Sequence, residues 1–174
     1  KGSIKPFTWK IQELKPHSEQ RRSALRPEKM LKKSEILKSH CCCNRVQDPY
    51  STRCMSHVHG DCHEIFEHAS NAIKTEINSI TDNPIIVGYD SAKDIVSGGN
   101  FHGQRISSVM RYLAGALTNL SAISERRINN LVDGSQNHLP KFLIKDNGLN
   151  SGLMMVQYSA ASLVADNKTL CPPI

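Results

Sequence analysis

The feature that most constrains the fold is a long stretch with helical periodicity and no proline, from about Gln104 to Leu131. Apolar side chains recur along it at steps of three and four residues, which places them on one helical face: Ile106, Val109, Met110, Leu113, Leu117, Leu120, Ile123 and Ile128. A helix of this length spans about 40 Å at 1.5 Å per residue. Long helices of this kind pack side by side, so the sequence predicts a helical bundle.

Two further stretches show the same periodicity. We expect one helix from about Asp61 to Ile80, stopped by Thr81-Asp82-Asn83-Pro84, and another from about Ser151 to Leu170 with Ser151 as its cap. Between them, Ile85-Ile86-Val87 and Ile95-Val96 flank a polar turn, a pattern typical of a small hairpin. The predicted fold class is therefore mainly α, a long-helix bundle with one small β-hairpin.

The amino-terminal part of the chain looks different. Residues 1–33 carry basic side chains, prolines and only scattered apolar positions, so we expect a loosely structured approach segment with at most a short helix. Ser34 followed by Glu35 predicts a helix start, and this helix should end before Pro49. We therefore divide the chain into residues 1–33 and a partial helical-bundle domain over residues 34–174.

The net charge of +6 is local. Residues 1–40 hold eleven Lys and Arg against four Glu, whereas residues 41–174 hold eleven against twelve Asp and Glu. A basic arm without interleaved aromatic residues is typical of a solvated tail, so we expect no nucleic-acid partner. No apolar run reaches membrane-spanning length and no secretory leader is seen, so we expect no membrane partner and a cytoplasmic location.

Two clusters could carry chemistry. Cysteine and histidine side chains spaced closely enough for a tetrahedral zinc site are Cys54, His57, His59, Cys62 and His63. The alternative is that they lie around a helix start, where only some can face one point. The second cluster has Gln47, Tyr50 and Arg53 at steps of three, which would align them on a helical turn.

This second cluster suits an amino-acid substrate. An arginine fork matches a carboxylate, a phenol can relay a proton, and an amide can orient a substrate without charge. Ordinary surface residues would give the same pattern, so spacing alone leaves the role open. Residues 97–103 add a glycine-flanked turn that delivers Phe101 and His102 just before the longest helix. Its glycines imply tight backbone geometry or a close approach, and it lacks the context of a phosphate loop.

Several segments, in order and with matching spacing, resemble motifs of histidine ammonia-lyases within the aromatic amino acid ammonia-lyase family: Arg45–Cys54, Val58–Gly60, Thr81–Pro84, Ser97–Gly103, Ser124–Ile128 and Gly148–Gly152. The resemblance implies a helical enzyme of the fumarase/aspartase-like fold, normally a homotetramer. It also implies non-oxidative deamination of L-histidine to trans-urocanate and ammonia, a step of histidine catabolism. The implied electrophile is 4-methylideneimidazole-5-one, made from an internal Ala-Ser-Gly.

The resemblance also assigns roles to site residues. Arg53 would pair with the substrate carboxylate. The catalytic Tyr50, together with Gln47, would line the site near the electrophile, and Phe101 would pack against the substrate or the prosthetic group. His102 in a Phe-His-Gly context is closer to the histidine enzymes than to the plant phenylalanine enzymes. The family motifs account for Cys54 and His59 without a metal, so we expect no metal site.

The chain departs from the family pattern in one decisive way, because no Ala-Ser-Gly occurs in it. It also opens at Lys1 instead of a methionine, and we interpret it as an excerpt of a longer polypeptide that is inactive alone. Smaller departures include Glu19 where a glycine is expected. Two alternatives stay open: a phenylalanine or tyrosine ammonia-lyase or aminomutase, and a non-catalytic scaffold that lost the electrophile loop.

Overall fold

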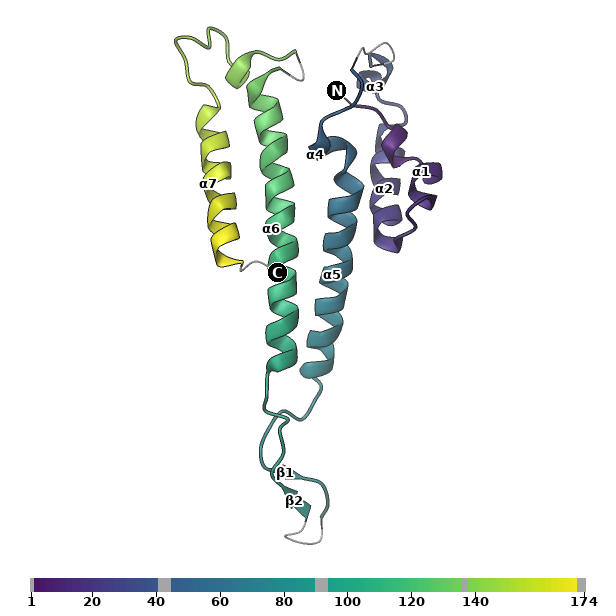
Figure 1. Cartoon of the computed structure of the whole chain (residues 1–174), viewed down its shortest axis with the longest axis vertical. Coiled ribbons are helices and arrows are strands. Elements are labelled where there is room, and N and C mark those ends of the chain that lie inside the picture. The colour runs from purple at the N-terminus through teal and green to yellow at the C-terminus, as the bar shows by residue number, and fades with distance from the viewer. Residues whose placement is uncertain (1, 41–44, 90–93, 136–137, 172–174) are drawn as a thin grey trace.

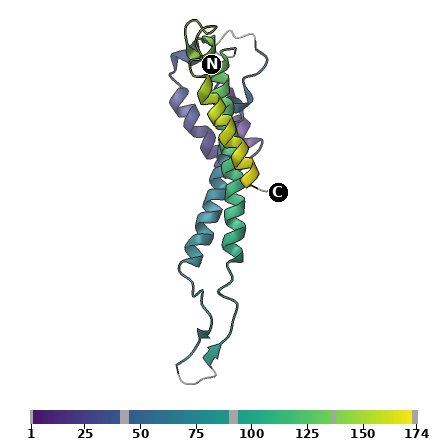
Figure 2. The ribbon, with the colours of Figure 1, turned by 90° about the vertical axis from the view of Figure 1, so that its left-hand side faces the viewer.

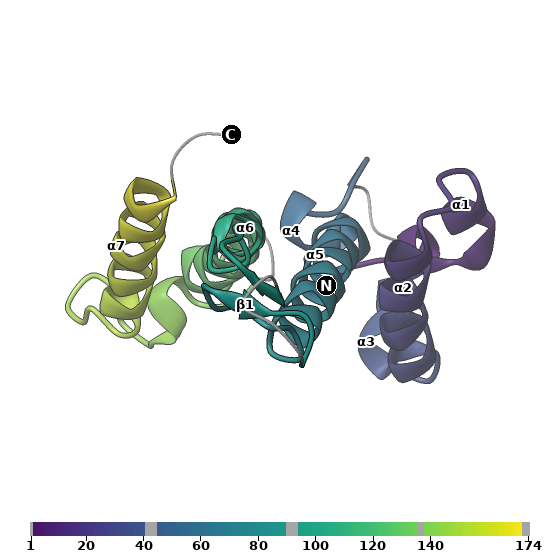
Figure 3. The same cartoon turned by 90° about the horizontal axis from the view of Figure 1, so that it is seen from below.

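The computed structural model describes residues 2–40, 45–89, 94–135 and 138–171. Its two longest helices, α5 (Met55–Glu76) and α6 (Gln104–Asp133), lie side by side and run in opposite directions (Figure 1). α7 (Met154–Leu170) packs along α6, and α2 (Ser18–Leu31) packs along α5. Seen from below, α7, α6, α5, α2 and α1 (Trp9–Glu13) form a row, so the described helices make an open, layer-like bundle (Figure 3).

Short elements complete the described chain: η1 (Lys5–Phe7), α3 (Glu35–Lys38), α4 (Tyr50–Arg53), β1 (Ile85–Ile86), β2 (Ile95–Val96) and η3 (Lys141–Leu143). The two strands pair antiparallel, with Ile85 opposite Val96 and Ile86 opposite Ile95. Figure 2 shows this hairpin extending beyond the ends of the long helices. The prediction of a mainly α fold with one small hairpin is confirmed.

The seam between α5 and α6 holds the centre of the core. Ala69 and Ala72 of α5 meet Val109 of α6, with Leu113 packed against this cluster. The small side chains of Ala69 and Ala72 let the two helices approach closely, so that the apolar stripe of α6 packs against α5. α6 ends at Gly134, whose φ of 74° is left-handed and where a Cβ would lie 2.5 Å from the carbonyl oxygen of Leu139. Glycine is therefore required at this helix end.

The expectation of at most a short helix in residues 1–33 is wrong. α2 has 14 residues and continues through Pro27. Its stability comes from packing on α5, since a Cβ on Gly60 would lie only 2.5 Å from the backbone of Gln20. Tertiary contacts of this kind override local propensity. The division of the chain at residue 33 stays a prediction.

Several helix boundaries also differ from expectation. The helix after Ser34 does end before Pro49, as expected, because α3 ends at Lys38; residues 41–44 lie outside the described residues. α5 begins at Met55 instead of Asp61, because α4 leads into it through the single joint residue Cys54. α7 begins at Met154. The backbone carbonyl of Ser151 accepts a hydrogen bond from the Met154 N–H, but the Ser151 side chain does not cap the helix.

Candidate active site

The four-residue helix α4 carries two of the predicted site residues, Tyr50 and Arg53. It begins directly after Pro49, whose φ of −53° and ψ of 139° are not helical. Gln47 therefore precedes the helix, and the predicted alignment of all three side chains on one helical turn is wrong. The physical reason is Pro49, because a proline ring disfavours the helical region for the residue before it. The Gln47 side chain is exposed beside α4.

The inner side of α4 is held by polar contacts from α6. Ser51 is 2% exposed. Arg127 donates from Nε to the Ser51 carbonyl oxygen at 3.0 Å, and Asn130 donates from Nδ2 to the Ser51 Oγ at 2.9 Å. Arg127 also contacts His59, with 3.0 Å between Nη2 and Nε2. Because a guanidinium only donates, His59 accepts this bond as a neutral imidazole.

The electrostatics of this contact agree with its geometry. Burial, followed by the charge of Arg127 and by His63, lowers the pKa of His59 below its ordinary value. Burial also lowers the pKa of Arg127. The structure thus favours the neutral form of His59, the form that can accept from Arg127.

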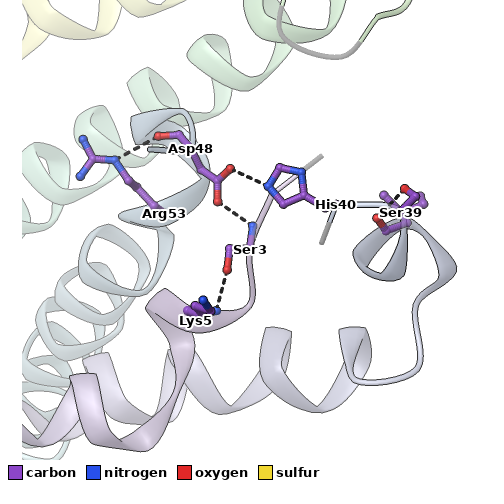
Figure 4. A network of polar contacts seen from close by, with 7 residues as sticks. Ser3, Lys5, Ser39, His40, Asp48 and Arg53 are labelled. Carbon is purple, nitrogen blue, oxygen red and sulfur yellow. Dashed lines mark hydrogen bonds and ion pairs between the residues drawn. The ribbon is translucent and has the colours of Figure 1, made fainter. Parts of the chain in front are cut away.

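The loop before α4 is fixed by Asp48 (Figure 4). One oxygen of its carboxylate accepts from the Ser3 backbone nitrogen at 2.6 Å, and the other lies 3.3 Å from His40 Nε2. The Asp48 carbonyl oxygen accepts from Arg53 Nε at 3.1 Å. This bond orients the guanidinium so that both of its terminal nitrogens lie on the side away from Asp48 (Figure 4). Arg53 can therefore present its paired donors to a carboxylate.

A cleft of about 650 Å³ opens beside α4, between the start of α2 and the helices α5 and α6. Tyr50 lines it with a side chain that is 64% exposed. The cleft also holds side chains of both charges and two histidines: Lys15, Arg126, Asp61, Glu64, His17 and His57. Burial lowers the pKa of His57, and the nearby Lys15 and His17 lower it further. Such a cleft can receive a zwitterion.

Arg126 is oriented toward this cleft by Glu125, which is 5% exposed. Both oxygens of the Glu125 carboxylate accept from the Arg126 guanidinium, and one also accepts from Gln157 Nε2 at 3.1 Å. The hydrogen bond from Arg126 is the largest cause of a lowered pKa at Glu125, which burial opposes. Because Gln157 belongs to α7, this contact also joins α7 to α6.

Phe101 lies far from α4 in this chain. Its position is just before the first residue of α6, and α6 begins at the end that lies away from α4 in Figure 1; its side chain is 62% exposed. The 22 residues of α5 span about 33 Å between these ends. The glycines near Phe101 are expected from the sequence to allow a close approach of other atoms. At Gly99 and Gly103 this chain shows no such approach, because an added Cβ would meet nothing within 4 Å. The described chain does not bring Phe101 to Tyr50.

The possible zinc cluster does not converge. Among the described residues, no group of three or more His, Cys, Asp or Glu side chains is placed to hold a metal ion. The side chains point around α5: His57 lines the cleft beside Tyr50, while His59 and His63 line a groove of about 690 Å³ between α2 and α5. Within the same described ranges, no helix is long and apolar enough to cross a membrane.

Sequence reasoning missed the contacts that hold α4. Ser51, Arg127 and Asn130 are polar residues of the kind that usually faces solvent, and they lie 76 and 79 positions apart in the chain. Arg127 did fall within one of the family-like motifs, but no chemistry of that motif indicated a partner. One signal was present in the sequence: Arg127 is a charged residue within the long helix whose apolar stripe was expected to pack against other helices, so a buried partner could have been sought for it.

Comparison with known proteins places this geometry in a family. The whole chain, residues 1–174, matches the family described as aromatic amino acid lyase. Histidine ammonia-lyase of Myxococcus xanthus is 46% identical over 172 residues, which cover 99% of this chain and 34% of that protein. Human histidine ammonia-lyase is 44% identical over 177 residues, covering 99% of this chain and 27% of that protein.

Solved structures agree with these sequence relatives. The crystal structure of histidine ammonia-lyase from Trypanosoma cruzi matches with a TM-score of 0.84 and 38% identity, covering 99% of this chain and 31% of that one. Phenylalanine aminomutase from Pantoea agglomerans matches with a TM-score of 0.83 and 31% identity, covering 99% and 37%. The chain spans about a third of the length of these relatives. It belongs to the aromatic amino acid lyase family.

Proposed function

We propose that this chain is one part of a longer carbon–nitrogen lyase that converts L-histidine non-oxidatively to trans-urocanate and ammonia. The observation that carries the proposal is the 46% identity to a histidine ammonia-lyase along nearly the whole chain. Among solved structures, the identity to a histidine ammonia-lyase is 38% and that to a phenylalanine aminomutase is 31%. Both comparisons favour histidine as the substrate.

The roles of the site residues follow from the geometry around α4. Arg53, oriented by the Asp48 carbonyl, binds the substrate carboxylate through its terminal nitrogens. Tyr50 lies on the open side of α4, where its phenol oxygen can hold and move a proton during C–N cleavage. Gln47 orients the bound amino acid through its exposed amide. Phe101 packs against the substrate or the prosthetic group, contributed by a different part of the assembly from Tyr50.

The electrophile of the complete enzyme would be 4-methylideneimidazole-5-one, contributed by a part of the protein outside this chain, which contains no Ala-Ser-Gly. The exposed donors fit such a group, because Tyr50 and Gln47 both present hydrogen-bonding side chains at the open edge of α4. When bound, the group supplies an electron-poor centre that activates the amino acid for loss of ammonia.

We also propose that the complete protein is a homotetramer and that it is cytoplasmic. The surface that the described helices leave uncovered supports the first of these proposals. None of the described residues of α7 is buried, and large apolar side chains remain exposed along it: Met155, Val156, Tyr158, Leu163 and Leu170. Several exposed apolar side chains on one helix favour an interaction site there. The separation of Phe101 from Tyr50 in one chain also favours a site assembled from several copies.

The second candidate is an aminomutase or lyase acting on phenylalanine or tyrosine. The TM-score of 0.83 to a phenylalanine aminomutase supports this second candidate. The test is to incubate the full-length protein separately with L-histidine, L-phenylalanine and L-tyrosine, and to measure ammonia and the organic product. Ammonia and urocanate from histidine support the proposal. Turnover of phenylalanine or tyrosine alone supports the second candidate, and no turnover of any supports the scaffold alternative.

A further inference from the structure

The orientation of α4 has to be set by other elements. A helix of four residues contributes too few internal hydrogen bonds to be stable alone. It is joined to α5 by Cys54, whose φ of −98° and ψ of 10° break the helical path between the two elements. The direction in which Tyr50 and Arg53 point therefore depends on what holds α4 from its inner side.

Hydrogen bonds, more than apolar packing, hold that inner side. An open pocket of about 290 Å³ lies between α4 and α6 and is lined by Ser51, Thr52, Arg127 and Asn130, among others. Because space remains there, van der Waals contact alone would let α4 shift. The bonds from Arg127 and Asn130 to Ser51 join residues that line this pocket, and they fix both the backbone and the side chain of one α4 residue.

Stabilising α4 through Arg127 costs desolvation free energy. Its guanidinium is partly buried, and the acceptors that the structure shows for it, the Ser51 carbonyl and the neutral His59, carry no charge. A partly buried cation with neutral acceptors loses part of its hydration, which those acceptors only partly replace. Its planar fork, however, can hold two groups on different helices in one fixed geometry, which a lysine cannot.

We propose that Arg127 is a positioning residue of the lyase, which clamps α4 through Ser51 and thereby fixes Tyr50 and Arg53 relative to α5 and α6. The inference rests on the proposed function, because Tyr50 and Arg53 are the reacting side chains of that proposal. Tyr50 is the neighbour of Ser51 in the same turn, so a rotation of α4 about its axis displaces the phenol and the guanidinium together. Asn130 supports the clamp at the Ser51 hydroxyl.

The test uses the full-length protein with Arg127→Met, Arg127→Lys and Asn130→Ala, and with Arg111→Met as a matched control. Arg111 is an exposed arginine on the same helix. A misplacement of about 1 Å costs roughly a hundredfold in rate, so we expect kcat/KM of Arg127→Met to fall by about ten- to a hundredfold, mainly through kcat. Arg127→Lys should recover part of this loss, because lysine can reach one acceptor but not both. Arg111→Met should match the parent protein.

A second measurement does not depend on activity. The amides of Thr52, Arg53 and Cys54 donate hydrogen bonds within the α4 turn, so their hydrogen exchange reports how firmly α4 is held. We expect faster exchange at these amides in Arg127→Met and Asn130→Ala, and no change in Arg111→Met. If the parent protein turns over none of the three amino acids, the proposed function fails, and faster α4 exchange still supports the clamp.

Two results would overturn the inference. One is unchanged α4 exchange in Arg127→Met and Asn130→Ala, whatever the activity. The other is a lower Tm with parental kcat/KM in the folded fraction, because a purely stabilising arginine would behave in that way. Should Arg127→Met fail to fold, Arg127→Lys and Asn130→Ala decide the question by the same two measurements.

Discussion

The close contact between α2 and α5 at Gly60 makes a quantitative prediction for Gly60→Ala. The added Cβ would lie 2.5 Å from both the nitrogen and the Cα of Gln20, and 2.9 Å from the carbonyl carbon of Glu19. Carbon atoms in contact prefer about 3.5 to 4.0 Å, so the two helices must separate by about 1 Å. The neighbours are backbone atoms, which cannot rotate out of the way as a flexible side chain would.

Overpacking of this kind costs about 1 to 3 kcal/mol. Alanine in a helix is about 1 kcal/mol better than glycine, which offsets part of that cost. Because the neighbours are rigid backbone atoms, we expect a cost in the upper part of that range, about 2 to 3 kcal/mol, and therefore a net loss of about 1 to 2 kcal/mol in the free energy of unfolding. For a chain of this size the loss corresponds to a Tm lower by roughly 2 to 8 °C. Separation of the helices would also strain the buried bond from Gln20 Nε2 to Gln12 Oε1, now 2.9 Å long.

Thermal unfolding of the purified chain, followed by far-ultraviolet circular dichroism, measures this effect. Gly148→Ala is the matched control, because a Cβ at this exposed turn residue meets nothing within 4 Å and its φ is not in the left-handed range. We expect the control to leave Tm within about a degree, in keeping with surface substitutions outside special sites. A Tm of Gly60→Ala equal to or above that of the parent chain would refute the close packing of α2 on α5.

Three further predictions follow from the site. In the full-length protein, Arg53→Lys should lower kcat/KM by roughly ten- to a hundredfold, because it loses paired charge-assisted bonds worth about 1.5 to 3 kcal/mol; parental kinetics would remove Arg53 from the site. Tyr50→Phe should act mainly on kcat, as measured by steady-state kinetics, and a change confined to KM would contradict a role in proton transfer. The folded pKa of His59 lies below its unfolded value near 6.5, so the unfolded state takes up the proton first and stability should fall as pH drops below that value. Urea unfolding at a series of pH values should show a shallower fall in His59→Gln, and an identical fall would exclude this histidine as a source.

The fold was predictable wherever local periodicity decided it. The stripe from Ile106 to Ile128 needs only one helix to explain it, and α6 follows it closely. α2 was missed for the opposite reason, since its place depends on the absence of a side chain at Gly60, far away in the chain. A proline inside α2 argues against a helix locally, and only the contact with α5 reverses that argument.

The site was predictable in its residue types more than in its geometry. The motif around Tyr50 and Arg53 predicts an amino-acid-binding role, which stays a prediction, and both residues lie in α4. Pro49 separates Gln47 from that helix, which the spacing of three did not reveal. The clamp by Arg127 joins residues more than seventy positions apart, so no local pattern could show it. The distance of Phe101 from α4 likewise depends on the direction of the long helices.

One competition experiment tests the central claim most directly. The full-length protein is given equal concentrations of L-histidine, L-phenylalanine and L-tyrosine, and the products are identified by mass spectrometry, with Arg53→Lys run in parallel. The account predicts trans-urocanate as the dominant product, formed with an equal amount of ammonia, and a large loss of urocanate in Arg53→Lys. Products derived from phenylalanine or tyrosine in its place, or no product from any of the three, would contradict it.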